Sequence, residues 1–111
     1  MFSDDRPIYR QIRDRIIERI LTVGDGAMLP SVRALAAEAG VNPLTVAKAY
    51  QDLQTAELVR ARKGVGLFAA DGAVERLLNS EREAFLSDEW PRVKARISRL
   101  GLDVADLLAN A

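Results

Sequence analysis

The side chains on which most catalytic and metal sites depend are missing from this chain. Its 111 residues include no histidine and no cysteine. Their absence excludes a disulfide framework, a Cys/His zinc site, a Ser-His-Asp triad and a cysteine nucleophile. Carboxylates could still hold a hard metal ion, but no acid/base pair stands out in the sequence. We therefore expect neither an enzyme nor a cofactor.

A protein that binds DNA needs side chains that donate hydrogen bonds to phosphates and side chains that reach base edges from a helix in the major groove. Polar side chains of both kinds occur near residues 42–48. Asn42 can pair with adenine through two hydrogen bonds, Thr45 can bond a phosphate or touch a thymine methyl, and Lys48 can contact a phosphate. Pro43 and Leu44 could pack on thymine methyls or simply fill the turn. In the alternative interpretation Asn42 only caps a helix and Lys48 is a solvated surface residue.

Two other segments carry candidate phosphate contacts. Ser31 lies at a predicted helix N-terminus, where backbone N–H groups suit an anion, although capping alone would explain this serine. Arg62 and Lys63 stand beside Gly64 and Gly66 and could reach a minor groove or its phosphates. The glycines are needed first for a tight turn, and a Gly-x-Gly outside a strand-to-helix context is weak evidence for a nucleotide site.

Three predicted helices position these side chains. The first starts at Pro7, with Asp5 as a cap, and ends at Gly24. The second runs from Ser31 to about Ala39, and the third starts directly after Gly40-Val41-Asn42, so a tight turn joins two short helices as in a helix-turn-helix. Apolar residues at three- and four-residue steps predict the buried faces. These residues are Ile8, Tyr9, Ile12, Ile16, Ile17, Ile20 and Leu21, then Val32, Leu35, Ala36 and Ala39, then Val46, Ala49, Tyr50 and Leu53.

After the third helix the hydrophobic period changes. Residues 58–62 and 67–69 are typical of strands, and residues 63–66 of the turn between them. Because a two-stranded hairpin is marginal in water, we expect it to lean on the third helix and to pair with Met28-Leu29. The predicted fold is mainly α with a small β-hairpin, a winged helix-turn-helix DNA-binding domain over residues 1–70.

Residues 71–111 are predicted to form a short helical dimerisation tail. One helix is expected to break near Ser87, a second to follow it with Pro91 in its first turn, and Asp103 to cap a last short helix. A tail of this length cannot bury its apolar stripes alone, so it must pack on the winged domain, on a second subunit, or on both. The candidate dimer-interface residues are Leu77, Phe85, Trp90, Val93, Ile97 and Leu100.

Charge and hydropathy patterns limit the location and the partners. The 16 basic and 16 acidic residues cancel, with a net charge of +2 in residues 1–70 and −2 in residues 71–111. No apolar run approaches the roughly 18 residues that a membrane span needs, and the N-terminus is too charged for a signal peptide. We expect a cytoplasmic protein without a membrane partner.

Three stretches resemble the GntR family of bacterial transcriptional regulators. They are residues 29–36 (LPSVRALA), 41–53 (VNPLTVAKAYQDL) and 64–68 (GVGLF), and the opening PIYRQI at residues 7–12 also matches. The Asn-Pro-x-Thr-Val-x-Lys-Ala-Tyr form is similar to the YtrA-type branch, whose members carry a short helical tail. The resemblance implies that Arg33 contacts DNA, and that a homodimer, joined by its tail, represses transcription from a pseudo-palindromic operator. It also leaves room for a small-molecule effector of unknown identity.

The chain departs from the family pattern at several positions. Glu57 stands where many members have a glycine in a left-handed helix cap, and this leaves the geometry of the turn open, because a residue with a side chain is strained at positive φ. Leu67 replaces a wing threonine, and Pro43 stands where other branches carry an arginine. Asp103 and Asp106 could ligate a metal as in other branches, but the histidine ligands are absent, so no metal site is expected. The alternative hypothesis is a winged-helix module that binds proteins without specific DNA binding.

Overall fold

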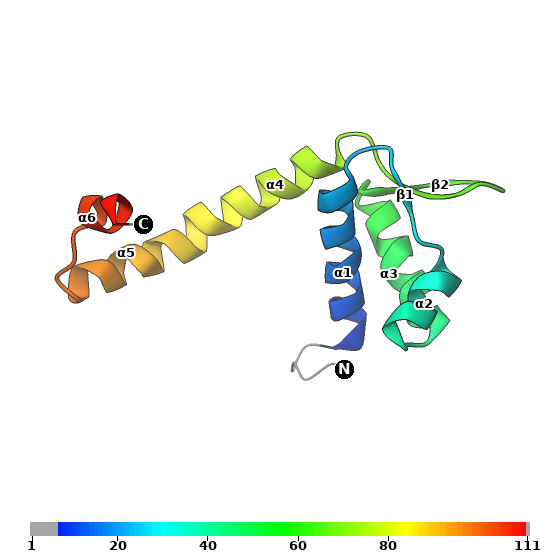
Figure 1. Cartoon of the computed structure of the whole chain (residues 1–111), viewed down its shortest axis with the longest axis horizontal. Coiled ribbons are helices and arrows are strands. Elements are labelled where there is room, and N and C mark those ends of the chain that lie inside the picture. The colour runs from blue at the N-terminus through cyan, green and yellow to red at the C-terminus, as the bar shows by residue number, and fades with distance from the viewer. Residues whose placement is uncertain (1–6, 111) are drawn as a thin grey trace. The chain divides into compact units, whose positions relative to one another are not determined.

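The computed structural model describes residues 7–110 (Figure 1); the predicted cap at Asp5 lies outside this range. The described elements in chain order are α1 (Ile8–Val23), β1 (Met28–Leu29), α2 (Val32–Ala39), α3 (Pro43–Thr55), β2 (Val59–Arg62), β3 (Gly66–Ala69), α4 (Ala73–Ala84), the π-helical turn η1 (Phe85–Glu89), α5 (Trp90–Arg99) and α6 (Val104–Ala109). The chain forms two compact units, unit one ending at Arg76 and unit two beginning at Leu77.

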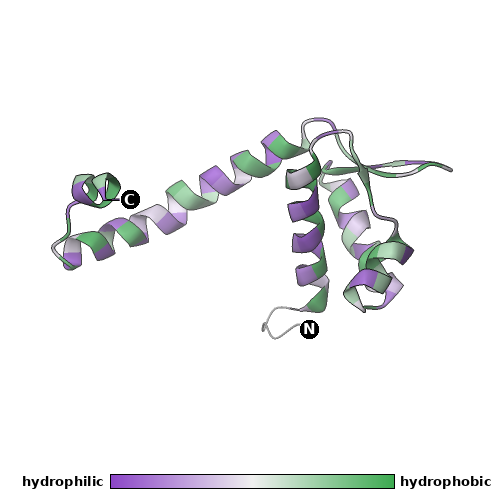
Figure 2. Cartoon of the chain, viewed as in Figure 1, coloured by the Kyte–Doolittle hydropathy of each residue, from purple (hydrophilic) through white to green (hydrophobic). Residues whose placement is uncertain are grey.

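The core of unit one lies where α1 and α2 pack against α3. The apolar stripe of α1 alternates with charged residues along the helix (Figure 2), and Ile12, Ile16 and Ile20 are buried as predicted. The other predicted residues of this stripe are less covered: Tyr9, Ile17 and Leu21 are half-buried, and Ile8, in the first turn of α1, is 49% exposed. All four predicted core residues of α3 are buried. Of the four predicted for α2, Leu35 and Ala36 are buried, whereas Val32 and Ala39 are half-buried. Burying each large aliphatic side chain stabilises the fold by about 1.5–3 kcal/mol.

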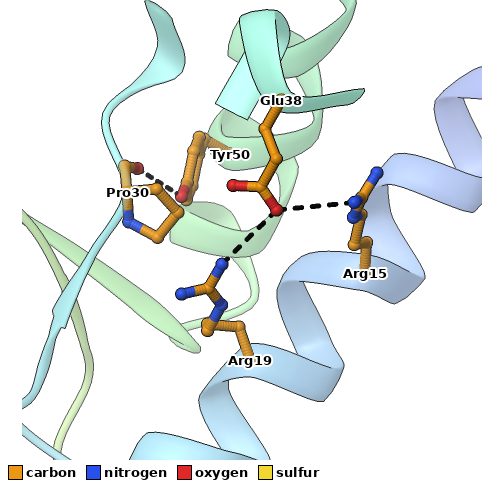
Figure 3. Close-up of polar contacts among 5 residues, drawn as sticks. All are labelled: Arg15, Arg19, Pro30, Glu38 and Tyr50. Atoms are coloured by element: carbon orange, nitrogen blue, oxygen red, sulfur yellow. Dashed lines mark hydrogen bonds and ion pairs between the residues drawn. The ribbon is translucent and has the colours of Figure 1, made fainter. Parts of the chain in front are cut away.

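Polar contacts add to this packing (Figure 3). Glu38 of α2 pairs with Arg15 at 3.4 Å and with Arg19 at 3.7 Å, both on α1. These pairs are half exposed and so contribute little. The Tyr50 hydroxyl donates to the Pro30 carbonyl at 2.6 Å, which ties α3 to the segment before α2. Burial raises the pKa of Tyr50 to about 12.

The predicted pairing of the hairpin with Met28-Leu29 is confirmed. The antiparallel sheet has the order β1-β3-β2, in which Met28 faces Phe68 and Leu29 faces Leu67. Gly64, at φ 76°, lies in the turn that joins β2 to β3. The edge strand β1 therefore ties the hairpin to the segment between α1 and α2, and the wing does not stand alone.

The end of α3 decides the geometry that the missing glycine had left open, and it is the left-handed one. Glu57 has φ 62° and follows the helix C-cap Ala56. The Leu58 N–H donates to the Leu53 carbonyl at 2.9 Å and the Glu57 N–H to the Gln54 carbonyl at 3.0 Å, which is the bonding of a Schellman motif. A glycine would adopt this conformation without a clash of its side chain, whereas Glu57 is strained.

Unit one includes the first turn of α4. Hydrogen bonds of two side chains, Asp25 and Arg76, connect this turn to the winged domain. Asp25 accepts backbone N–H groups from Gly72 at 2.7 Å and Val74 at 3.1 Å, and these two bonds lower the pKa of its carboxyl group. Arg76 donates to the Glu57 carbonyl and, at 2.9 Å, to the Asp71 carbonyl. These contacts explain why the first turn of α4, up to Arg76, belongs to unit one.

The predicted helix break near Ser87 is wrong. Helix α4 continues through the π-helical turn into α5, and the Ser87 hydroxyl donates to the Glu83 carbonyl at 2.7 Å within the helix. Pro91 has no N–H, and its ring would clash with the Ser87 carbonyl of a regular α-helix. The wider π turn, in which the Trp90 N–H donates to the Phe85 carbonyl five residues earlier, accommodates this proline.

Candidate nucleic-acid interface

The N-terminus of α2 presents two of the predicted contacts. The Ser31 hydroxyl accepts the Ala34 N–H at 3.0 Å, so its capping role is confirmed. Arg33 lies in the first helical turn and is exposed. No ion pair engages the Arg33 guanidinium within the described residues, so its donors can face solvent or a ligand.

The turn into α3 presents a polar cap and an exposed apolar side chain. Asn42 Oδ1 accepts the Leu44 N–H at 2.8 Å, which uses one lone pair and leaves the Nδ2 donors available. Pro43 is exposed, and Leu44 is 77% exposed, more than any other large apolar side chain in the described residues. Thr45 is half-buried on the same turn. The beginning of α3 is therefore an exposed tip with donors, an acceptor and an apolar contact.

Lys48 lies one turn further along α3 and has a partner that sequence reasoning missed. Its Nζ lies 4.7 Å from the ring centroid of Tyr9 on α1. The Tyr9 hydroxyl donates to the Asp52 carboxylate, also on α3. The periodicity of the first helix assigned Tyr9 to the apolar stripe. The four-residue spacing of Lys48 and Asp52 was the available signal that both side chains share one face.

The hairpin presents the remaining basic contacts. The Arg62 guanidinium lies over the Phe68 ring, 5.5 Å from its centroid, while Lys63 and Gly64 are exposed at the turn. Gly66 has φ 152°, and a Cβ built there would lie 3.6 Å from the Met28 side chain. Both glycines therefore serve the wing backbone.

The predicted residues thus fall into two sets. The candidate DNA contacts come from the start of α2, the start of α3 and the wing, all within unit one, whereas every candidate dimer residue lies in unit two. Over residues 7–110, no group of three potential ligands could hold a metal ion, and no helix is long and apolar enough to cross a membrane.

Comparison with known proteins shows which family this chain belongs to. Residues 5–68 match the family described as bacterial regulatory proteins, gntR family. Over 109 residues the chain is 38% identical to the HTH-type transcriptional regulator YhcF of Bacillus subtilis, covering 96% of this chain and 88% of that protein. It is also 35% identical to the transcriptional repressor YtrA of Bacillus subtilis over 77 residues, which span 68% of this chain and 59% of YtrA.

Comparison with solved structures leads to the same family. A GntR family transcriptional regulator from Listeria monocytogenes is similar with a TM-score of 0.74 and 30% identity, covering 97% of this chain and 95% of that one. The DNA-binding domain of AraR in complex with operator ORX1 is similar with a TM-score of 0.58 and 26% identity, covering 63% of this chain and 93% of that one. The chain therefore belongs to the gntR family of bacterial regulatory proteins, and it is a transcriptional regulator with a winged helix-turn-helix DNA-binding domain, not an enzyme.

Proposed function

We propose that this regulator is a homodimeric repressor that binds a pseudo-palindromic operator in double-stranded DNA. The observation that carries the proposal is that no side chain from Leu77 to Asn110 is buried, although unit two is rich in large apolar residues. A face of this kind needs a covering partner. A second copy supplies one and doubles the number of base pairs that are recognised, since one recognition helix reads only a few. The name of the relative YtrA supports the repressor role.

The DNA contacts follow from the exposed tip of α3. With its N-terminus in the major groove, Asn42 and Thr45 meet base edges and the exposed Leu44 packs on a thymine methyl. Phosphate contacts around this helix set the register. The residues proposed to contact DNA are Ser31, Arg33, Asn42, Pro43, Leu44, Thr45, Lys48, Arg62, Lys63, Gly64 and Gly66.

The dimer face follows from the π turn. In an unbroken α-helix, five residues turn a side chain about 140° away from its starting direction. Through the π turn, Phe85 and Trp90 instead stack with centroids 6.3 Å apart and planes at 26°. The apolar stripe of α4 therefore continues onto α5. We assign the dimer interface to Leu77, Phe85, Trp90, Val93, Ile97 and Leu100, with residues 1–70 as the DNA-binding domain and residues 71–111 as the tail.

Repression is then steric: the dimer occupies promoter DNA in the cytoplasm and excludes the transcription machinery. An effector that tilts the tails would change the spacing of the two recognition helices and release the operator.

The experiment that tests the proposal selects from a random double-stranded library at two salt concentrations and sequences the retained DNA. We expect an enriched inverted repeat and an affinity that falls steeply with salt. Arg33→Ala should weaken binding to every sequence and lower the salt slope by about one per half-site. The matched control is Arg99→Ala, an exposed arginine of unit two, which should bind as the parent does. Enrichment of a single half-site by a monomer would refute the dimeric repressor.

The second candidate function is a protein-binding winged-helix module. The zero net charge and the exposed Leu44 favour it, because an apolar tip on a neutral domain also suits a protein partner. This module would show no salt-dependent DNA affinity and no enrichment, so the same selection separates the two functions.

A further inference from the structure

The contact of Lys48 with α1 raises the question of what holds this lysine in place. Lys48 and Asp52 are four residues apart on α3, a spacing at which oppositely charged side chains ordinarily form an ion pair. Among the described residues these two do not pair. Tyr9 interacts with both, although it lies 43 positions from Asp52 in the sequence. Its hydroxyl donates a hydrogen bond to the Asp52 carboxylate, and the Lys48 ammonium lies over its ring face.

The chemistry of the two contacts differs in a way that favours DNA. A carboxylate would occupy the N–H groups of the ammonium and cancel its charge, whereas a ring face supplies no lone pair and leaves the charge in place. Lys48 is exposed, so a phosphate can approach from the open side. The hydrogen bond to Asp52 raises the pKa of Tyr9, and the phenol therefore keeps the proton that it donates.

The surroundings of Tyr9 are also basic. Arg10 and Arg13 line a depression of about 400 Å³ beside Tyr9, together with Asp14. With Lys48 on the ring face, three cations lie around this tyrosine, against the two carboxylates of Asp14 and Asp52. The cations outnumber the carboxylates here, which favours an approaching anion, and the hydrogen bond from Tyr9 gives the Asp52 carboxylate a partner other than Lys48.

We propose that Tyr9 is a positioning residue of the DNA interface. Its hydrogen bond to Asp52 and the contact of its ring with Lys48 prevent an ion pair between Lys48 and Asp52 within α3. The Lys48 ammonium therefore stays available to a DNA phosphate. This inference rests on the proposed function. It adds α1, which no predicted contact includes, to the elements that determine DNA affinity.

The test measures the affinity of the full chain for a short duplex of arbitrary sequence over a range of salt concentrations. Phosphate contacts do not depend on sequence, so no operator is needed. In Tyr9→Phe the ring remains but Asp52 is released to pair with Lys48. We expect affinity to fall about three- to tenfold and the salt slope to decrease toward that of Lys48→Ala, which loses about one counterion per half-site.

The double variant Tyr9→Phe/Asp52→Asn gives the readout that a merely structural role would not produce. Removing the competing carboxylate should restore the affinity and the salt slope, although the Tyr9–Asp52 hydrogen bond is gone. Asp52→Asn alone should bind at least as tightly as the parent. Tyr50→Phe is the matched control, because the other tyrosine of this core donates to the Pro30 carbonyl (Figure 3) and its loss should lower the melting temperature without changing the salt slope.

Three outcomes would overturn the inference. They are parental affinity in Tyr9→Phe, a double variant that stays as weak as Tyr9→Phe, and a salt slope unchanged by Lys48→Ala. Each leaves the proposed function intact, because the parent protein still binds. Absence of salt-dependent binding by the parent itself would instead overturn the proposed function and this inference with it.

Discussion

Replacing Glu57 by glycine should stabilise the protein. Glu57 has φ 62°, and among the described residues it is the only one other than glycine in the left-handed region. This conformation costs a residue with a Cβ about 1–2 kcal/mol, while glycine adopts it freely. The main-chain bonds that close the α3 terminus, from Glu57 to the Gln54 carbonyl and from Leu58 to the Leu53 carbonyl, remain in the variant.

The net effect is smaller than the released strain. Glycine loses about 0.5–1 kcal/mol more conformational entropy than alanine on folding, so we expect Glu57→Gly to gain about 0.5–1 kcal/mol. For a domain of this size that corresponds to a rise of about 2–8 °C in Tm. The Glu57 side chain is exposed, and the contact with Arg76 involves the carbonyl, which glycine retains.

The assay is thermal and urea unfolding followed by circular dichroism, with all variants at one protein concentration because the proposed dimer would make Tm concentration-dependent. Glu57→Ala is the control, since it removes the carboxylate but keeps the Cβ that causes the strain. We expect Glu57→Gly to be more stable than Glu57→Ala, and Glu57→Ala to stay within about 0.5 kcal/mol of the parent. Equal stability of the glycine and alanine variants would refute the argument from backbone strain.

Three further changes test other parts of the structure. Burial raises the pKa of Tyr50 from 10.0 to about 12, above its unfolded value, so its contribution to stability is complete below pH 10 and is lost as pH rises towards 12. Tyr50→Phe should cost about 1 kcal/mol at neutral pH and flatten the alkaline loss in urea unfolding; an unchanged pH profile would contradict the burial of its phenol. Thr45→Ala should relax base preference in library selection while nonspecific affinity stays constant, and an unaltered sequence profile would remove Thr45 from base recognition. Trp90→Ala should shift the protein to monomer in sedimentation velocity, whereas a dimer as tight as the parent would exclude Trp90 from the interface.

The winged domain was largely predictable because its signals are local. A buried face repeats at a fixed helical period, which is why Ile12, Ile16 and Ile20 were identified from spacing alone. Ser31 and Asn42 mark the starts of two helices, because their side chains accept hydrogen bonds from backbone N–H groups three and two residues later. The missing glycine at Glu57, in contrast, left the geometry of the helix end open, and only the structure shows that Glu57 is left-handed.

The tail shows where local signals mislead. Serine and proline near Ser87 are ordinary signs of a helix end, yet the helix continues, because one wider turn absorbs the missing N–H of Pro91. Periodicity treats α4 and α5 as separate stripes, and only the π turn brings Phe85 and Trp90 to the same side. The consequence is a contact between Phe85 and Trp90 that a pattern of fixed period does not predict.

The sequence by itself determined the winged helix-turn-helix fold, since its elements depend on spacing within one helix or one turn, and short motifs in the same elements carried the resemblance to the family. Only the tertiary structure decided the role of Tyr9. Its hydroxyl and ring meet Asp52 and Lys48 because α1 packs along α3, and the two partners lie 43 and 39 positions away along the chain. A contact of that range is specified by the buried faces of both helices together, so neither helix alone carries a signal for it.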